Sequence, residues 1–206
     1  FFRADIAFLT RCAIRPDFEN RQVIRRIHMA GKDDRFDEIK TSFPRFLLTW
    51  SLQGLWVTFT AAAALAAITS TANIDFGIFA IAGLLIWIFG FAFEVLADAQ
   101  KSRFKADPKN KGKFISSGVW AWSRHPNYFG EITLWIGVAV IAFPVLQGWQ
   151  YVTLISPVFV ALLLIKISGI PMREEKADKK WGGQEDYERY KSNTPVLVPW
   201  PPKLLR

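Results

Sequence analysis

The chain has 206 residues with a formal net charge of +8, and 51% of its residues are hydrophobic. Apolar and basic residues are segregated along the sequence, so a membrane topology explains the basic charge without a nucleic-acid-binding face, and we expect no nucleic-acid partner. The single cysteine, Cys12, excludes a disulfide within the chain and a multi-thiolate metal site. No metal site is predicted.

Four apolar runs are long enough to cross a hydrocarbon core of about 30 Å. They cover residues 46–70, 76–97, 129–148 and 151–170. The sequence therefore predicts an all-α, polytopic membrane helix bundle with about four transmembrane helices. No linker or internal repeat divides residues 1–206, which we interpret as a single integral membrane domain. Because the chain starts with Phe1 and not with an initiator Met, we expect that its N-terminus is incomplete.

Basic residues are concentrated in alternate connections between these runs. Ten lie before residue 46, seven between 101 and 124, and eight after 170, whereas the loops at 71–75 and 148–150 have none. Since Lys and Arg accumulate on the cytoplasmic side of short loops, both termini and the basic middle loop are expected in the cytosol. The endoplasmic reticulum, a bacterial inner membrane or an organelle inner membrane would all suit this topology.

Polar side chains inside the first two apolar runs are candidates for substrate contact. A buried amide such as Gln53 must find a hydrogen-bond partner in lipid, either by helix packing or through a substrate. Near the end of the second run, Glu94, Asp98 and Lys101 fall on one helical face. Intramembrane carboxylates are functional candidates, although an ion pair to Lys101 or to a neighbouring helix would also satisfy them.

The loop at 101–113 is strongly basic and includes Lys105 and Lys113. Positive-inside bias and attraction to anionic lipid headgroups would each produce such a loop. A third interpretation is a clamp for pyrophosphate or a nucleotide 2′-phosphate. These interpretations are compatible with one another.

The stretch at 123–131 is the most informative part of the sequence, because it gathers polar groups at the start of an apolar run. Pro126 suits the first turn of a helix, and the N–H groups of that helix end favour an anionic ligand group. Asn127 could contact a carboxamide or a ribose, and Tyr128 could stack on a ring. A helix cap at Asn127 and an interfacial aromatic belt are the alternatives.

A C-terminal signature of membrane enzymes resembles several segments of this chain. It is shared by steroid 5-alpha-reductases, sterol C14 reductases and isoprenylcysteine carboxyl methyltransferases. The matching residues are Arg124-His125-Pro126-Asn127-Tyr128-Phe129-Gly130-Glu131, Glu174-Glu175, Trp181-Gly182, Asp186-Tyr187, Tyr190 and Val198-Pro199. Residues 31–40 and 53–56 are similar to a 5-alpha-reductase-like branch, so that the resemblance covers nearly the whole chain.

The resemblance implies a cytosolic pocket for NADPH, carried by residues 98–200. By motif position, the implied cofactor-binding residues are Asp98, Lys105, Lys113, Arg124, His125, Asn127, Tyr128, Glu131, Arg173, Glu174, Glu175 and Tyr187. Two positions that are Arg in the reductases are Lys105 and Lys113 here, which keeps the charge but loses the bidentate fork. Gln53 and Glu94 remain the candidates for substrate contact.

The activity that the resemblance implies is reduction by NADPH of a carbon–carbon double bond in a lipid-soluble enone. No catalytic residue is assigned, because in 5-alpha-reductases the groups that polarise the carbonyl lie in more N-terminal helices. One alternative is a membrane methyltransferase that uses S-adenosylmethionine. The basic loop argues mildly against this alternative, because S-adenosylmethionine has no phosphate to neutralise. Another is a non-catalytic subunit of a larger membrane assembly. Membrane lipids are expected partners in every case.

Overall fold

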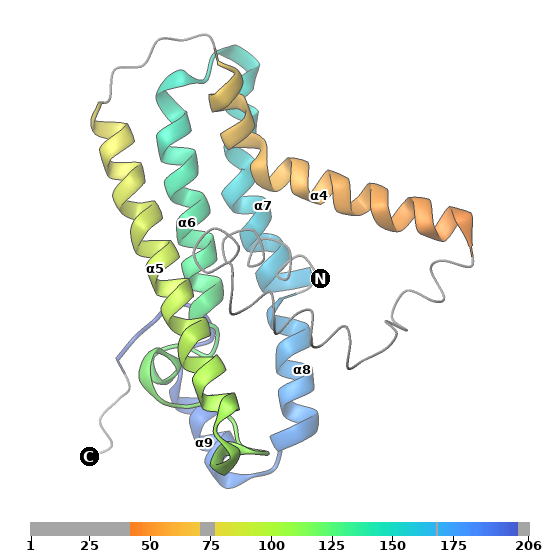
Figure 1. Cartoon of the computed structure of the whole chain (residues 1–206), viewed down its shortest axis with the longest axis vertical. Coiled ribbons are helices and arrows are strands. Elements are labelled where there is room, and N and C mark those ends of the chain that lie inside the picture. Colours follow the sequence, from red (N-terminus) through yellow and green to blue (C-terminus); the bar gives the residue numbers. More distant parts are fainter. Residues whose placement is uncertain (1–41, 71–76, 168, 202–206) are drawn as a thin grey trace. The chain divides into compact units, whose positions relative to one another are not determined.

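The computed structural model describes residues 42–70, 77–167 and 169–201, and within these ranges every regular element is a helix. The prediction of an all-α fold is therefore confirmed. The elements, which can be followed in Figure 1, are α4 (Phe43–Thr69), α5 (Ile78–Ala106), η2 (Pro108–Asn110), η3 (Gly118–Ala121), α6 (Pro126–Ala142), η4 (Phe143–Val145), η5 (Gly148–Ile155), α7 (Ser156–Leu162), η6 (Leu163–Ile167), α8 (Ile170–Trp181) and α9 (Glu185–Asn193).

The chain is divided into two compact units, and the boundary between them lies inside α4. The first unit is Phe1–Gly54, of which residues 42–54 are described and form the first part of α4. Gln53 is half-buried in this unit, and its predicted substrate contact stays a prediction. The second unit, Leu55–Arg206, contains the rest of α4 and every later helix.

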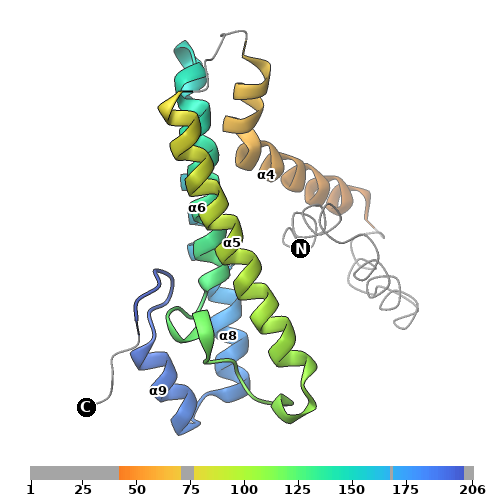
Figure 2. The same cartoon turned by 60° about the vertical axis from the view of Figure 1, so that its left-hand side comes forward.

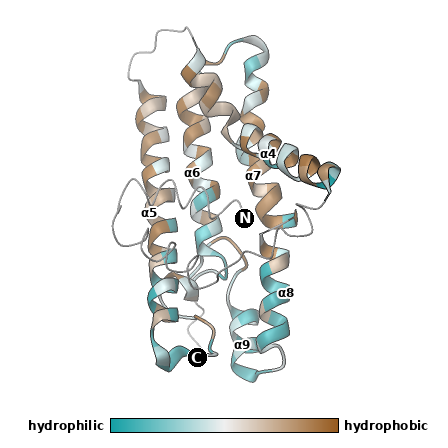
Figure 3. Ribbon diagram, turned by 45° about the vertical axis from the view of Figure 1, so that its right-hand side comes forward, coloured by the Kyte–Doolittle hydropathy of each residue, from teal (hydrophilic) through white to brown (hydrophobic). Residues whose placement is uncertain are grey.

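In the described part of the chain, four helical segments are long and apolar enough to cross a membrane, as the sequence predicts. They are Phe43–Thr69, Ile78–Ala106, Pro126–Val145 and Gly148–Trp181. Figure 3 shows hydrophobic residues along α5, α6 and α7, and hydrophilic residues on α8 and α9. The chain is therefore an integral membrane protein.

The helices differ from the predicted spans at several points, and α4 and α6 each begin three residues earlier than predicted. The helix α5 continues well beyond residue 97, where the apolar run ends, because the polar residues that follow are good helix formers. The fourth segment is not one regular helix: η5, α7, a π-helical turn η6 and α8 follow one another. Pro157 and Pro171 lie in the first turns of α7 and α8, where a missing N–H is tolerated.

Glycines bring the backbones of α5 and α6 into direct contact. A Cβ atom added to Gly90 would lie 2.7 Å from the Gly130 carbonyl oxygen, and one added to Gly83 would lie 2.8 Å from the Gly137 carbonyl oxygen. Because Gly83 faces Gly137 and Gly90 faces Gly130, the two helices run antiparallel, side by side in Figures 1 and 2. Small residues permit this close approach in membranes, where van der Waals packing drives helix association.

The second part of α4 packs on α7 within the same unit. The ring centroid of Phe159 lies 5.3 Å from that of Phe59 and 6.4 Å from that of Trp56. The Ser156 hydroxyl donates a hydrogen bond to the Thr60 carbonyl oxygen. This hydrogen bond gives the hydroxyl a partner, which the surrounding lipid could not provide.

We predict that Gly90→Ala destabilises the protein by about 1–3 kcal/mol, because the new methyl group meets main-chain atoms that cannot rotate away. Gly54→Ala is the matched control, since a Cβ atom there meets nothing within 4 Å. It should be neutral, or stabilising by up to about 1 kcal/mol, because Ala is the better helix former. Thermal unfolding of both variants in the same detergent checks this, and equal midpoints would contradict the close contact.

Candidate functional site

Polar side chains meet where α5 leaves the apolar region and α6 begins. The Asn127 side-chain nitrogen donates to the Asp98 carboxylate at 3.1 Å, and Asn127 is 1% exposed. Glu94 lies one turn before Asp98, half-buried, and its backbone packs against Gly130. The glycine contact between α5 and α6 thus sets the register that brings Asp98 to Asn127, two residues predicted from distant parts of the sequence.

The buried side chain of Trp120 fastens the loop before α6 to the polar end of α5. Its indole nitrogen donates to the Ala97 carbonyl oxygen at 2.9 Å. The Lys101 ammonium lies 4.3 Å from the centroid of the same ring, a cation–π contact. The Tyr190 hydroxyl, from α9, donates to the Trp120 carbonyl oxygen at 2.7 Å. Three segments of the chain therefore meet at this one residue.

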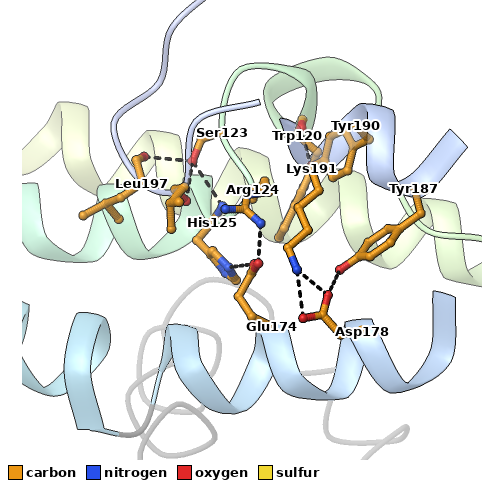
Figure 4. Close-up of polar contacts among 11 residues, drawn as sticks. Trp120, Ser123, Arg124, His125, Glu174, Asp178, Tyr187, Tyr190, Lys191 and Leu197 are labelled. Carbon is orange, nitrogen blue, oxygen red and sulfur yellow. Dashed lines mark hydrogen bonds and ion pairs between the residues drawn. The ribbon is translucent and has the colours of Figure 1, made fainter. Parts of the chain in front are cut away.

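Arg124, His125 and Glu174 form a cluster, here called the Arg-His-Glu cluster. Figure 4 shows that both basic side chains point to the same Glu174 carboxylate on α8. The His125 Nε2 atom lies 2.7 Å from one oxygen, and an Arg124 Nη1 hydrogen bond reaches the other. The side chains are only 13%, 9% and 20% exposed, respectively. The His125 ring also stacks on Tyr128, with centroids 5.4 Å apart.

Burial sets the charge of His125. It lowers the pKa of the imidazole below the ordinary value of 6.5, although the Glu174 carboxylate opposes this effect. The positive charges of Lys101 and Arg124 lower the pKa further. His125 is therefore neutral near pH 7, and because an ionised carboxylate only accepts, the neutral ring carries its proton on Nε2. Arg124 supplies the positive charge that faces Glu174.

One donor of the cluster is not used. The Arg124 Nε atom is buried, and no described residue accepts a hydrogen bond from it. A buried donor without a partner costs about 1–3 kcal/mol, more for a charged group. An oxygen atom of a bound molecule would recover this cost. The Arg124 Nε atom is therefore a candidate contact for a ligand oxygen or a water molecule.

Ser123 connects the cluster to the residues after α9, which we call the C-terminal strap (residues 194–201). The fully buried Ser123 hydroxyl accepts from the His125 backbone N–H at 3.1 Å and donates to the Leu197 carbonyl oxygen at 2.8 Å. The Arg124 backbone N–H donates to the Pro195 carbonyl oxygen at 2.9 Å. Sequence reasoning did not assign Ser123 a role. Its place just before the helix, where hydroxyl side chains often serve as caps, was the available signal.

A second polar group joins α8 to α9. The Asp178 carboxylate accepts from the Tyr187 hydroxyl at 2.9 Å and from the Lys191 ammonium at 2.7 Å (Figure 4). Burial and the Asp178 contact raise the pKa of the Tyr187 phenol. The Phe114 ring packs 5.3 Å from that of Tyr187, so the residue that follows the basic loop lies against α9. Tyr187 has a structural partner here, and its cofactor contact stays a prediction.

The other predicted residues lie in less buried positions. Lys105, Lys113 and Arg173 are exposed, and Glu131 is half-buried on α6. Glu175 is exposed on α8 and its carboxylate pairs with Lys179 at 2.6 Å. The structure therefore separates the predicted set into a buried group around Arg124 and Asn127 and an exposed group on the basic loop and α8.

Acid is expected to destabilise the protein through His125. Because the folded-state pKa lies below 6.5, the unfolded state binds the proton more readily, and stability falls as the pH drops through values below 6.5. Thermal unfolding between about pH 7.5 and pH 5 measures this fall, and His125→Gln should flatten it. His28→Gln removes the other histidine of the sequence and reports its contribution. A His125→Gln variant with an unchanged pH profile would refute this explanation.

Ser123→Ala should destabilise the protein by about 1–3 kcal/mol, because the buried His125 N–H and the half-buried Leu197 carbonyl each lose a partner. Ser192→Ala is the control, since the Ser192 hydroxyl is exposed and bonds only the Arg189 carbonyl oxygen one turn back. That variant should change stability by less than about 0.5 kcal/mol. Thermal unfolding in one detergent compares the two. Equal effects would show that the bridge to the strap contributes nothing.

Comparison with curated proteins and with solved structures found no match. A family model described as "Protein of unknown function (DUF1295)" matches residues 20–194. This range includes all four membrane-spanning segments, the Asp98–Asn127 pair and the Arg-His-Glu cluster. The match covers well over half of the chain. The chain therefore belongs to the family described as Protein of unknown function (DUF1295).

Proposed function

We propose that this protein is an NADPH-dependent membrane reductase, similar to the steroid 5-alpha-reductases, that reduces a carbon–carbon double bond in a lipid-soluble enone. The observation that carries the proposal is the buried Arg124 Nε donor, for which the described residues provide no acceptor. It lies in a segment that resembles the reductase signature, immediately before a membrane-spanning helix. A charged donor at such a boundary suits an anionic cofactor that serves a substrate dissolved in lipid.

The chemistry of the donor set fits NADPH. Its phosphates require cations, and Arg124 and Lys101 both lie near the start of α6. Glu174 holds the Arg124 side chain, and the Trp120 ring holds the Lys101 ammonium. Asp98 and Asn127 offer a carboxylate and an amide for ribose hydroxyls or the nicotinamide carboxamide. Lys105 and Lys113 would add positive charge from the exposed loop. The remaining predicted cofactor residues would contribute from α6, α8 and α9.

The chain's own residues would position the cofactor and the substrate and would not react with them. Bound NADPH supplies a hydride, so the protein has to bind, orient and exclude water. Glu174 holds Arg124 and His125 in fixed directions, and the His125–Tyr128 stack restricts the ring. The neighbouring carbon of the enone must then receive a proton. We assign no described residue to that step.

Sidedness follows from the basic residues. The polar end of the second unit carries the residues from 101 to 124 and those on α8 and α9. By the positive-inside rule this end faces the cytosol, where NADPH is available. The endoplasmic reticulum, a bacterial inner membrane and an organelle inner membrane all remain compatible with this orientation.

One observation favours a second candidate function, methyl transfer from S-adenosylmethionine. In the Arg-His-Glu cluster a guanidinium and a carboxylate lie side by side, each slightly accessible. Such a pair can receive the carboxylate and the ammonium group of an amino acid, and S-adenosylmethionine carries both. The basic loop is not needed for this ligand, which has no phosphate.

Binding of NADPH is expected to raise the thermal stability of the purified protein, by about 2.7 kcal/mol at about 100 times the Kd. Arg124→Gln should abolish most of this rise, because it removes the buried cation. Arg189→Gln is the matched control, since Arg189 is exposed and pairs only with Glu185 on its own helix. The measurement is the unfolding midpoint in titrations with NADPH, NADH and S-adenosylmethionine.

The three titrations separate the candidate functions. A rise with NADPH that Arg124→Gln removes and Arg189→Gln keeps would support the reductase and justify a screen of enone lipids. A rise with S-adenosylmethionine alone would replace it by the methyltransferase. No rise with any of the three would refute both enzymes and leave the non-catalytic subunit.

A further inference from the structure

The outer face of the C-terminal strap is apolar and exposed. Trp122, Val196, Val198 and Trp200 form what we call the strap patch. Val198 is 61% exposed and Trp200 is 66% exposed, although both are large and hydrophobic. The Trp200 backbone N–H donates to the Trp122 carbonyl oxygen at 2.9 Å, so these two exposed tryptophans are neighbours in space. A cluster of this kind normally marks an interaction site.

The position of the strap patch identifies its surroundings. Trp122 precedes Pro126, the first residue of the third membrane-spanning segment, by only four positions. In both Figure 1 and Figure 2 the blue strap rises from α9 beside the lower end of α6, where this segment begins. Backbone hydrogen bonds from Arg124 to Pro195 and from Trp200 to Trp122 hold the strap beside the start of this segment, so the patch lies at the end of a membrane-spanning helix.

The composition of the region suits the boundary between hydrocarbon and headgroups. Tryptophan is enriched there because its ring is apolar and its N–H can bond to water or headgroups. The last turn of α5 adds Arg103 and Lys105, both exposed, which complement anionic headgroups at the same end of the unit. The exposed side chains of Val196 and Val198 add apolar area to the patch.

We propose that the strap patch is inserted into the membrane interface, on the side where the Arg-His-Glu cluster lies. Lipid then covers the outer face of the strap, while Ser123 and Arg124 bond to its inner, backbone side. The strap is thus held between the bilayer and the start of α6. This inference does not depend on which cofactor, if any, the cluster binds.

Spin-label accessibility in nanodiscs tests the proposal. In a Cys12→Ser background, Val198→Cys is labelled and its collision rates with oxygen, which concentrates in lipid, and with a water-soluble nickel chelate are compared. Leu85→Cys, exposed on the apolar part of α5, is the lipid control, and Glu185→Cys, 86% exposed on α9 and outside the four membrane-spanning segments, is the water control. The oxygen-to-nickel ratio at Val198 should be severalfold above that at Glu185 and below that at Leu85.

Two outcomes would overturn the proposal. A ratio at Val198 equal to that at Glu185 would mean that the patch faces water. Low collision rates with both reagents would mean that protein covers it, for example another part of this chain. Each labelled variant is also tested for an unchanged unfolding midpoint, and because Val198 is largely exposed its replacement should not disturb the fold. Thr194→Cys, at a buried position of the strap, provides the reference for burial by protein.

Discussion

Contact between the backbones of α5 and α6 is the constraint on which the candidate site depends. With Gly83 against Gly137 and Gly90 against Gly130, neither helix can slide along the other without placing a side chain against main-chain atoms. This register extends past the glycines to the polar end, where Ala97 meets Trp120 and Asp98 meets Asn127. Packing deep in the membrane therefore determines which polar groups meet outside it.

Glu174 has the corresponding role for the segments after α6. One carboxylate accepts from both Arg124 and His125, so α8 is tied to the start of α6 at two atoms. Since His125 is kept neutral by burial, the positive charge of Arg124 alone balances the negative charge of Glu174. A balanced, hydrogen-bonded cluster can remain buried, while the unused Arg124 donor keeps a capacity for binding.

Hydropathy predicted the four spans because lipid tolerates few charges, whatever the tertiary structure. It placed the start of the third span three residues late, because Pro126, Asn127 and Tyr128 precede the apolar run and are already helical. The polar residues of the cluster were named from the resemblance, but their sharing of one carboxylate is a tertiary fact. The hydrogen bonds from Ser123 and Arg124 to the strap could not be predicted from the sequence, because they use backbone carbonyls that no side-chain pattern reveals.

The spacing of the glycines also determines how α5 and α6 wind about each other. Gly83 and Gly90, like Gly130 and Gly137, are seven positions apart, and fully buried Ala97 extends the same interval on α5. Two seven-residue steps fall short of four full turns of a straight α-helix by about 20° each, so straight helices would lose contact along this row. A left-handed crossing of the two helices compensates for such a drift. The seven-residue interval therefore favours a left-handed coil of this pair, which would keep it in contact from the apolar end of α5 to Asp98.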